Sequence, residues 1–221
     1  MRTERRSPIR LLFVVAIAMP LALLATVARG QQAYEDFLAA VANDRADEVK
    51  KLLARGIDPN TVDKNGDPAL VIASRLGYVA TVDALLAGRA NPNAKNPSGN
   101  TPLMVAAIGG HLDVGKRLRT AGADINFAGW TPLIYAATGG RDSFVTWLLA
   151  EGADINAVSP NGTTALMMAV RENKPSTVEL LLARGANPNI RNQNDASALD
   201  WAKRNEDKAL VERLRKAGAR D

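Results

Sequence analysis

The chain has 221 residues, of which 47% are hydrophobic, and it contains a single histidine and no cysteine. This composition excludes a disulfide and argues against a zinc site or a Cys-His pair, because both need several histidine or cysteine side chains. Of the 28 basic and 23 acidic residues, residues 1–30 hold five arginines and one glutamate, which leaves 23 basic and 22 acidic residues. The remainder is nearly neutral and has no excess of Lys and Arg to follow phosphates, so we expect no nucleic-acid partner.

Residues 1–30 have the composition of a secretory signal peptide. Four arginines occur in residues 1–10, an uncharged apolar run extends from Leu11 to Ala25, and small residues follow at Ala28 and Gly30. We predict cleavage after Ala28 or Gly30, and therefore a periplasmic or secreted protein, with a bacterial periplasm favoured. The apolar run is shorter than the about 20 residues that a membrane span needs. An uncleaved signal anchor is the alternative, and the leader would then be the only membrane attachment.

The rest of the chain contains a repeat with a period of 33 residues. Equivalent leucines occur at steps of 33, 30, 33 and 33 residues, at Leu70, Leu103, Leu133, Leu166 and Leu199. A second marker has the same period, with steps of 33, 33, 30 and 33 residues, and ends at Asn60, Asn93, Asn126, Asn156 and Asn189. Two independent markers with one period indicate an internal repeat. We predict one elongated domain at residues 31–221, with units at about 31–62, 63–95, 96–128, 129–158, 159–191 and 192–221.

The local pattern of one unit predicts two helices. Thr101 can cap the first helix through its hydroxyl group, and Pro102 suits the first helical position, where no amide hydrogen is needed. Leu103, Ala106 and Ala107 then share one narrow face of small side chains. A turn and a second apolar stripe follow, and a glycine just past the second helix suits a left-handed residue. We expect this left-handed glycine at positions 56, 88, 122, 152 and 185.

These features together resemble the ankyrin repeat, over roughly residues 31–221. The resemblance rests on the period, on the Thr-Pro-Leu-x-x-Ala-Ala sequences that begin at Thr101 and Thr131, and on the Gly-Ala-Asp-x-Asn sequences that begin at Gly122 and Gly152. It implies an all-α solenoid of about six helix-turn-helix units with β-hairpin-like fingers. The family's histidine after the leucine is absent, so the hydrogen bond by which it tethers the loop is not expected. The residues at that position are Val71, Met104, Ile134, Met167 and Asp200.

The resemblance also implies a non-catalytic monomer that binds another protein on a concave face. In similar proteins this face consists of the finger tips and the residues after the Ala-Ala pair of the inner helix. Carried onto this chain, the face comprises Arg75, Leu76, Asn100, Ile108, Trp130, Thr138, Thr163, Arg171, Glu172, Lys203 and Arg204. Its middle is small and apolar and its basic groups gather towards the carboxy-terminal end, which favours a partner with an apolar centre and an acidic edge. The alternative is that these charges only solvate the solenoid.

The period breaks once, after Asn126, where the finger is shorter than its equivalents. Phe127 and Trp130 lie close to its tip, and two interpretations remain open. Both rings can contact a partner, or both can fold down over the space that the shorter finger leaves. A different function, the binding of a small molecule or cofactor near Trp130 and Tyr135 to protect an envelope enzyme, predicts a deep pocket there. The protein-binding function predicts a shallow groove along several units.

The search for catalytic chemistry gives no candidate. His111 occupies the turn after an inner helix, where a structural hydrogen bond is expected. Met167 and Met168 are expected to pack in the core, and Gly115 in a second helix indicates close packing or a local weak point. We therefore predict no cofactor, no metal and no enzymatic activity.

Overall fold

The computed structural model describes residues 30–221, so the predicted signal peptide lies outside the described residues except for Gly30. In this part of the chain the helices follow one another in pairs, and no strand occurs. Residues 30–42 are helical and precede α2 (Ala46–Ala54). The later pairs are α3 (Ala69–Leu76) with α4 (Val79–Ala87), α5 (Pro102–Gly109) with α6 (Leu112–Thr120), α7 (Pro132–Gly139) with α8 (Asp142–Ala150), α9 (Ala165–Arg171) with α10 (Pro175–Ala183), and α11 (Ala198–Arg204) with α12 (Lys208–Lys216).

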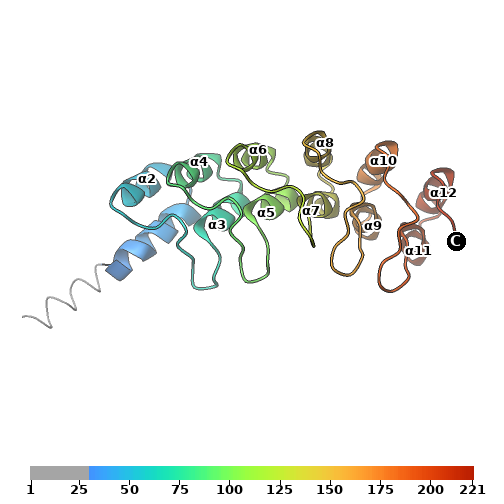
Figure 1. Ribbon diagram of the computed structural model, residues 1–221, viewed down its shortest axis with the longest axis horizontal. Coiled ribbons are helices and arrows are strands. Elements are labelled where there is room, and N and C mark those ends of the chain that lie inside the picture. The colour runs from blue at the N-terminus through green and yellow to red at the C-terminus, as the bar shows by residue number, and fades with distance from the viewer. Residues whose placement is uncertain (1–29) are drawn as a thin grey trace, which may run out of the picture.

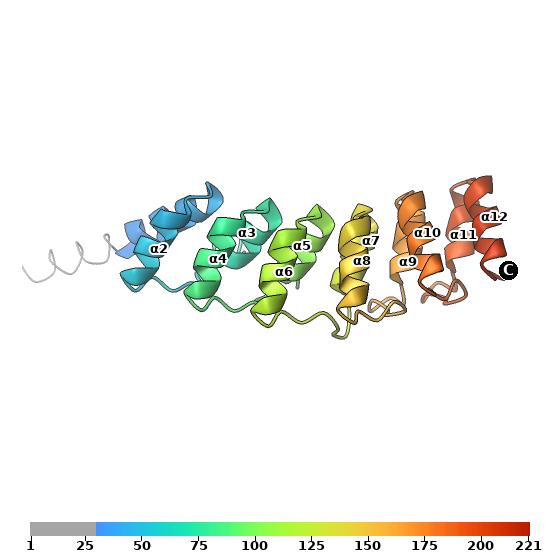
Figure 2. The same cartoon turned by 90° about the horizontal axis from the view of Figure 1, so that it is seen from above.

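The pairs stack side by side in two rows (Figures 1 and 2). The odd-numbered helices from α3 to α11 are the inner helices. The even-numbered helices are the outer helices, and they form an outer row that arches over the inner helices. This arrangement confirms the expected all-α repeat architecture. The β-hairpin-like fingers are not confirmed, because the loops of residues 30–221 contain only one isolated β-bridge, between Val62 and Pro68. Among the described residues, no helix is long and apolar enough to cross a membrane.

Hydroxyl side chains cap the amino-terminal ends of four of the inner helices. Thr101 Oγ1 accepts a hydrogen bond from the Met104 amide at 3.4 Å, and Thr131 Oγ1 accepts one from the Ile134 amide at 3.3 Å. Thr164 and Ser197 cap α9 and α11 in the same way. A cap of this kind stabilises a helix by about 1 kcal/mol. The capping role that the Thr-Pro sequence predicts is therefore confirmed.

The small inner-helix face allows neighbouring units to approach closely. Leu103, Ala106 and Ala107 are fully buried, as are their counterparts in α7, and the core runs without interruption from Phe37 to Leu214. Each unit inside the stack therefore contributes a buried face to both of its neighbours, as a solenoid requires.

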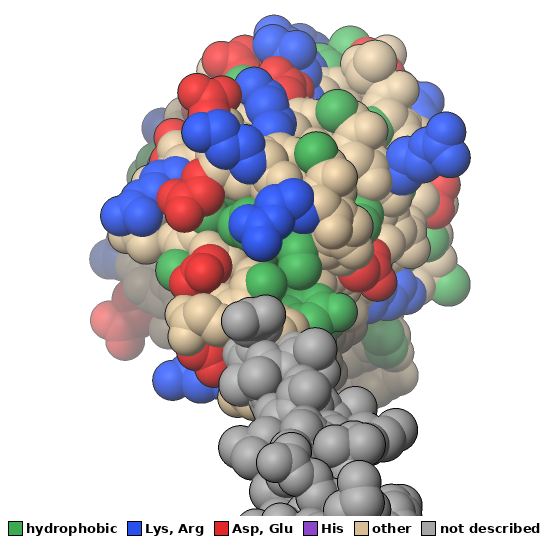
Figure 3. Space-filling model, turned by 90° about the vertical axis from the view of Figure 1, so that its left-hand side faces the viewer, with side chains coloured by type: hydrophobic (Ala, Val, Ile, Leu, Met, Phe, Trp, Pro, Cys, Tyr) green, Lys and Arg blue, Asp and Glu red, His purple; other side chains and the backbone are tan. Residues whose placement is uncertain are grey.

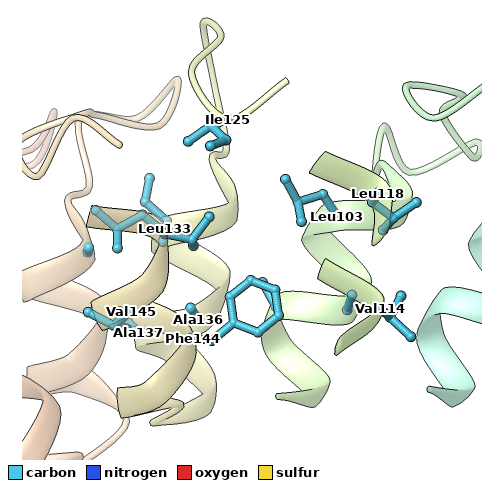
Figure 4. Close-up of a cluster of buried hydrophobic side chains, with 14 of the residues drawn as sticks. Leu103, Val114, Leu118, Ile125, Leu133, Ala136, Ala137, Phe144 and Val145 are labelled. Carbon is cyan, nitrogen blue, oxygen red and sulfur yellow. The ribbon is translucent and has the colours of Figure 1, made fainter. Parts of the chain in front are cut away.

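One place in this core deviates from the repeat. Gly115 of α6 stands where four other units carry a fully buried valine, namely Val49, Val82, Val145 and Val178. A Cβ atom at Gly115 would lie 2.5 Å from Phe144 Cζ. Figure 4 shows the Phe144 ring turned from α8 towards the units of α5 and α6. Gly115 thus provides the space that Phe144 fills, so the close packing expected at this glycine is confirmed.

A row of asparagine side chains joins the loops of consecutive units. Asn60 Oδ1 accepts a hydrogen bond from the Asn91 amide at 2.8 Å, and Asn93 Oδ1 accepts one from the Asp124 amide at 2.9 Å. The same contact occurs at the other three markers, where Asn126, Asn156 and Asn189 accept from the amides of Asp154, Asn187 and Arg220. These contacts hold the loops together without the family's histidine, because each one satisfies a backbone amide of the next unit.

The amino-terminal end of the stack has a mixed surface. In Figure 3, Lys, Arg, Asp and Glu side chains surround a smaller apolar group on this end. Tyr34, in the first helical segment, is 46% exposed, whereas Phe37 beside it is fully buried. The first helical segment therefore has one buried side and one solvent-exposed side, which is typical of the end of a solenoid.

Candidate protein-binding face

One row of side chains lies at the carboxy-terminal ends of the inner helices. The members are the residues five positions after each repeat leucine, and we call them the inner row: Arg75, Ile108, Thr138, Arg171 and Arg204. Their helices lie side by side (Figure 2), so the inner row runs along the stack. Ile108 is 38% exposed, and Leu76 next to Arg75 is 44% exposed. Two exposed aliphatic side chains on neighbouring helices make the amino-terminal part of this surface apolar.

A network of hydrogen bonds holds the first finger and neutralises Arg75. Arg75 Nη2 lies 2.7 Å from Asp67 Oδ2, and Asp67 Oδ1 accepts a hydrogen bond from Asn96 Nδ2 of the next finger at 2.8 Å. Burial by itself acts to raise the pKa of the nearby Asp63 carboxyl, but hydrogen bonds outweigh this effect. The amides of Asp67 and Asn65 and the Asn65 side chain donate to that carboxyl, and together they hold its pKa below the ordinary value. These carboxylates therefore serve the structure of the loop.

The shortened finger is covered by aromatic side chains. Trp130 packs edge-on against Tyr135, with 6.1 Å between ring centroids, and both are partly buried against the core. Tyr135 Oη donates a hydrogen bond to Asn100 Oδ1, and burial raises the pKa of the Tyr135 hydroxyl. Lys95 Nζ lies 5.7 Å from the centroid of the Phe127 ring. For Trp130, this geometry favours a ring that folds over the shortened finger, whereas Phe127 is not among the side chains that pack against the core.

The carboxy-terminal part of the inner row is cationic, and a tryptophan ring lies beside one of its arginines. The Arg171 guanidinium carbon lies 5.5 Å from the centroid of the Trp201 ring, a cation–π distance. Arg171 also forms an ion pair with the adjacent Glu172 at 2.8 Å. Arg204 is exposed and belongs to no ion pair among residues 30–221. Trp201 was not among the expected site residues, although its position two residues after Leu199 matches that of Tyr135 after Leu133.

Two expected site residues do not belong to this surface. Thr163 is only 1% exposed, and its amide donates to Ser159 Oγ, so it packs inside the finger. Lys203 follows Leu199 by four positions, and its equivalents are fully buried against the next unit: Ser74, Ala107, Ala137 and Val170. Lys203 therefore lies outside the inner row, on the side that a further unit would cover, where it pairs with Asp221.

The remaining candidates are structural. His111 Nε2 lies 3.1 Å from the Arg75 carbonyl oxygen, which ties two units together as expected. Arg141 repeats this contact one unit later, because its Nε donates to the Ile108 carbonyl at 2.9 Å. Met167 and Met168 are buried in the core. Among residues 30–221, no three His, Cys, Asp or Glu side chains are grouped to hold a metal ion.

Comparison with known proteins gives one family and several partial relatives. The family model described as "Ankyrin repeats (3 copies)" matches residues 37–128, 77–159 and 133–220. Inactive serine/threonine-protein kinase TEX14 of Mus musculus is 36% identical over 78 residues, which are 35% of this chain and 5% of that protein. Putative ankyrin repeat protein YahD of Escherichia coli (strain K12) is 31% identical over 91 residues, 41% of this chain and 45% of that protein. Ankyrin repeat and KH domain-containing protein mask-1 of Caenorhabditis elegans is 45% identical over 65 residues, 29% of this chain and 2% of that protein. The chain spans less than half the length of each of these relatives.

Proposed function

This chain belongs to the ankyrin-repeat family, and we propose that it is a non-catalytic adaptor that binds another protein through the inner row and the residues beside it. Solenoids of this kind present extended concave surfaces to their partners. The observation that carries the proposal is the inner row itself, where exposed Ile108 and exposed Arg204 are fixed at equivalent positions of one rigid stack. Because the stack fixes the helices that carry these side chains before binding, no backbone has to be ordered on association.

The absence of catalysis is part of the same proposal. A general acid or base has to face a cavity in which substrate can lie. The described carboxylates whose pKa is lowered are Asp63, Asp200 and Asp221. Asp63 accepts hydrogen bonds within its own loop, Asp200 accepts them from the helix cap Ser197, and Asp221 accepts one from the Lys203 side chain. We do not propose a small-molecule site at Trp130, because the Tyr135 ring packs against the ring of Trp130.

We also propose that the protein is exported and acts in the periplasm or outside the cell. The support is the composition of residues 1–30, with clustered arginines, an apolar run and small residues at the predicted cleavage sites. Sequencing the amino terminus of the protein from its natural source tests this. The first residue should be Arg29 or Gln31, whereas a chain that begins at Met1 would support the signal anchor and contradict cleavage.

Capture of the partner tests the binding proposal. The protein would be cross-linked in cells of its source and purified beside two variants that fold equally well. Ile108→Ser with Arg171→Gln and Arg204→Gln changes the inner row, whereas Lys51→Ala with Arg184→Ala changes exposed charges on the outer helices. We expect one protein to be captured by the native chain and the outer-helix variant and lost with the inner-row variant. Equal capture by all three would contradict the proposed face.

A further inference from the structure

The three arginines of the inner row differ in how far their charge is available to a partner. Arg75 lies 2.7 Å from Asp67, whose side chain is only 14% exposed and is held by Asn96. Arg171 pairs with Glu172, which is 37% exposed and lies next to it in sequence. Arg204 has no ion-pair partner among the described residues. Available positive charge therefore increases from the amino-terminal to the carboxy-terminal half of the inner row.

The Trp201 ring lies beside the Arg171 guanidinium, whose carbon is 5.5 Å from the ring centroid. A guanidinium that lies over an aromatic ring keeps its edge available for in-plane hydrogen bonds, and a planar carboxylate matches that edge. Glu172 already uses this edge, since its Oε1 accepts from Arg171 Nε at 2.8 Å. The Glu172 carboxylate thus marks where an acidic group of a partner would bind, and it competes with that group.

The spacing of the helices sets the spacing of the partner's side chains. Neighbouring packed helices are about 8–10 Å apart, so Ile108 in α5 and Arg171 at the end of α9, two helices along, are about 16–20 Å apart. An extended chain advances about 3.3–3.6 Å per residue. Five or six residues therefore cover this distance, and about three more reach Arg204.

From these observations, and resting on the proposed function, we propose that the inner row binds an extended acidic segment of a partner protein. An apolar side chain of this segment contacts Leu76 and Ile108. A carboxylate about five or six residues away along the segment binds Arg171, and another about three residues beyond it binds Arg204. Glu172 lowers the affinity because it occupies Arg171.

Synthetic peptides test this proposal directly. The probe is a fluorescein-labelled Gly/Ser peptide with one leucine, a glutamate about six residues away and a second glutamate about three residues further. It is made in both chain orders. Matched peptides replace both glutamates by glutamine, replace leucine by serine, or place the first glutamate next to the leucine. Binding is measured by fluorescence anisotropy at low and at high salt.

We expect the probe in one of its two orders to bind, and each matched peptide to bind more weakly. Arg171→Gln and Arg204→Gln should each weaken binding about threefold to fivefold, the size of an exposed ion pair. Arg184→Gln on the outer row should change nothing. Glu172→Gln should tighten binding about twofold to threefold, because it removes the competing carboxylate. High salt should weaken the glutamate peptide more than the glutamine peptide.

The proposal is overturned if glutamate and glutamine peptides bind equally, if neither order binds, or if Glu172→Gln weakens binding. None of these results decides whether the inner row binds a protein at all, because the capture experiment tests that proposed function separately. A partner that is captured through Ile108 and Arg171, while no acidic peptide binds, would mean that the face is correct and this partner chemistry is wrong.

Discussion

Arg89 occupies a backbone position that glycine fills in the equivalent units. Its φ angle is 67°, whereas Gly88, where we expected the left-handed residue, has φ −76°. The equivalent residues of the other units are Gly56, Gly122, Gly152, Gly185 and Gly218, all with positive φ. A non-glycine residue in the left-handed region is strained by about 1–2 kcal/mol. Arg89 is therefore a point at which this chain is less stable than its own repeat allows.

Replacing Arg89 by glycine should stabilise the protein. We expect Arg89→Gly to raise the free energy of unfolding by about 1 kcal/mol, because the relief of strain exceeds the added flexibility of the unfolded chain. Urea unfolding measures this. Arg184→Gly is the matched control, since Arg184 is the equivalent of Gly88 and has φ −94°. A control variant that gains as much stability as Arg89→Gly would contradict the backbone explanation.

Asp63 should make stability depend on pH in the acid range. Although burial raises its pKa, the hydrogen bonds from Asn65 and Asp67 lower it below the ordinary value of 3.8. A carboxyl whose pKa is lower in the folded state contributes stability above its unfolded pKa, and this contribution is lost as the pH falls through the folded pKa. Stability should therefore decrease as the pH falls below about 4.

Asp63→Asn should reduce this acid dependence without unfolding the loop. Asparagine occupies the same position in two other fingers, where Asn96 and Asn192 accept the equivalent amide bonds. Thermal unfolding between neutral pH and about pH 3 should show a shallower decrease for the variant than for the native chain. Parallel curves for the two proteins would show that Asp63 does not contribute.

At the scale of the helices, Gly115 and Phe144 act as a pair across two units. Gly115 stands where valine is buried in the other units, and Phe144 stands where Thr81, Val114 and Thr177 occur. Phe144 also packs edge-on against Trp147, with ring centroids 5.2 Å apart. The large residue of one unit therefore depends on the small residue of the other.

Gly115→Ala should destabilise the protein because its Cβ would overlap Phe144. We expect a loss of about 1–3 kcal/mol, the usual effect of overpacking. When Phe144 is already leucine, the same change should cost at least about 1 kcal/mol less, because the ring that causes the overlap is gone. Chemical unfolding of the four proteins of this cycle gives the coupling energy. Strictly additive effects would show that the two residues do not depend on each other.

The repeat pattern predicts the helices well because each unit restates the same local chemistry. The cap at Thr101 and the buried face at Leu103 both follow from residue type and spacing alone. The loops were harder to predict: they form turns held by side chains such as Asn93 and not strands. Nothing in one unit reveals that Asn93 accepts an amide from the next one, because that contact exists only in the stack.

The errors at the candidate site also have physical causes. The prediction for Lys203 is one position out of register, because Ala202-Lys203 stands in α11 where α5 and α7 have the Ala-Ala pair, and the residue after that pair is Arg204. Thr163 was expected on the surface because it lies near a finger tip, but its finger folds over it. The role of Trp201 is hard to predict because a tryptophan in an amphipathic helix looks like core. Trp201 does pack against the core, but its ring also contacts the Arg171 guanidinium.

At the scale of the whole molecule, the proposed function depends on the order of the units. Each unit from α3 onwards contributes one residue to the inner row, so the stack arranges single residues into an ordered series with aliphatic Ile108 before the arginines Arg171 and Arg204. Neighbouring units hold that surface through asparagine contacts, shared cores and the His111 bond. A partner that reads several units at once gains specificity from their order, although each contact is weak.

The dissociation constant of the captured partner for the native chain and for Ile108→Ser tests this account most directly. Ile108 is exposed, so the variant should unfold at the same urea concentration as the native chain. The account predicts affinity at least about tenfold weaker for Ile108→Ser, as for a residue central to an interface. It also predicts unchanged affinity for the outer-row variant with Lys51→Ala and Arg184→Ala. Unchanged affinity for Ile108→Ser together with a loss for the outer-row variant would place the binding face on the other side of the molecule.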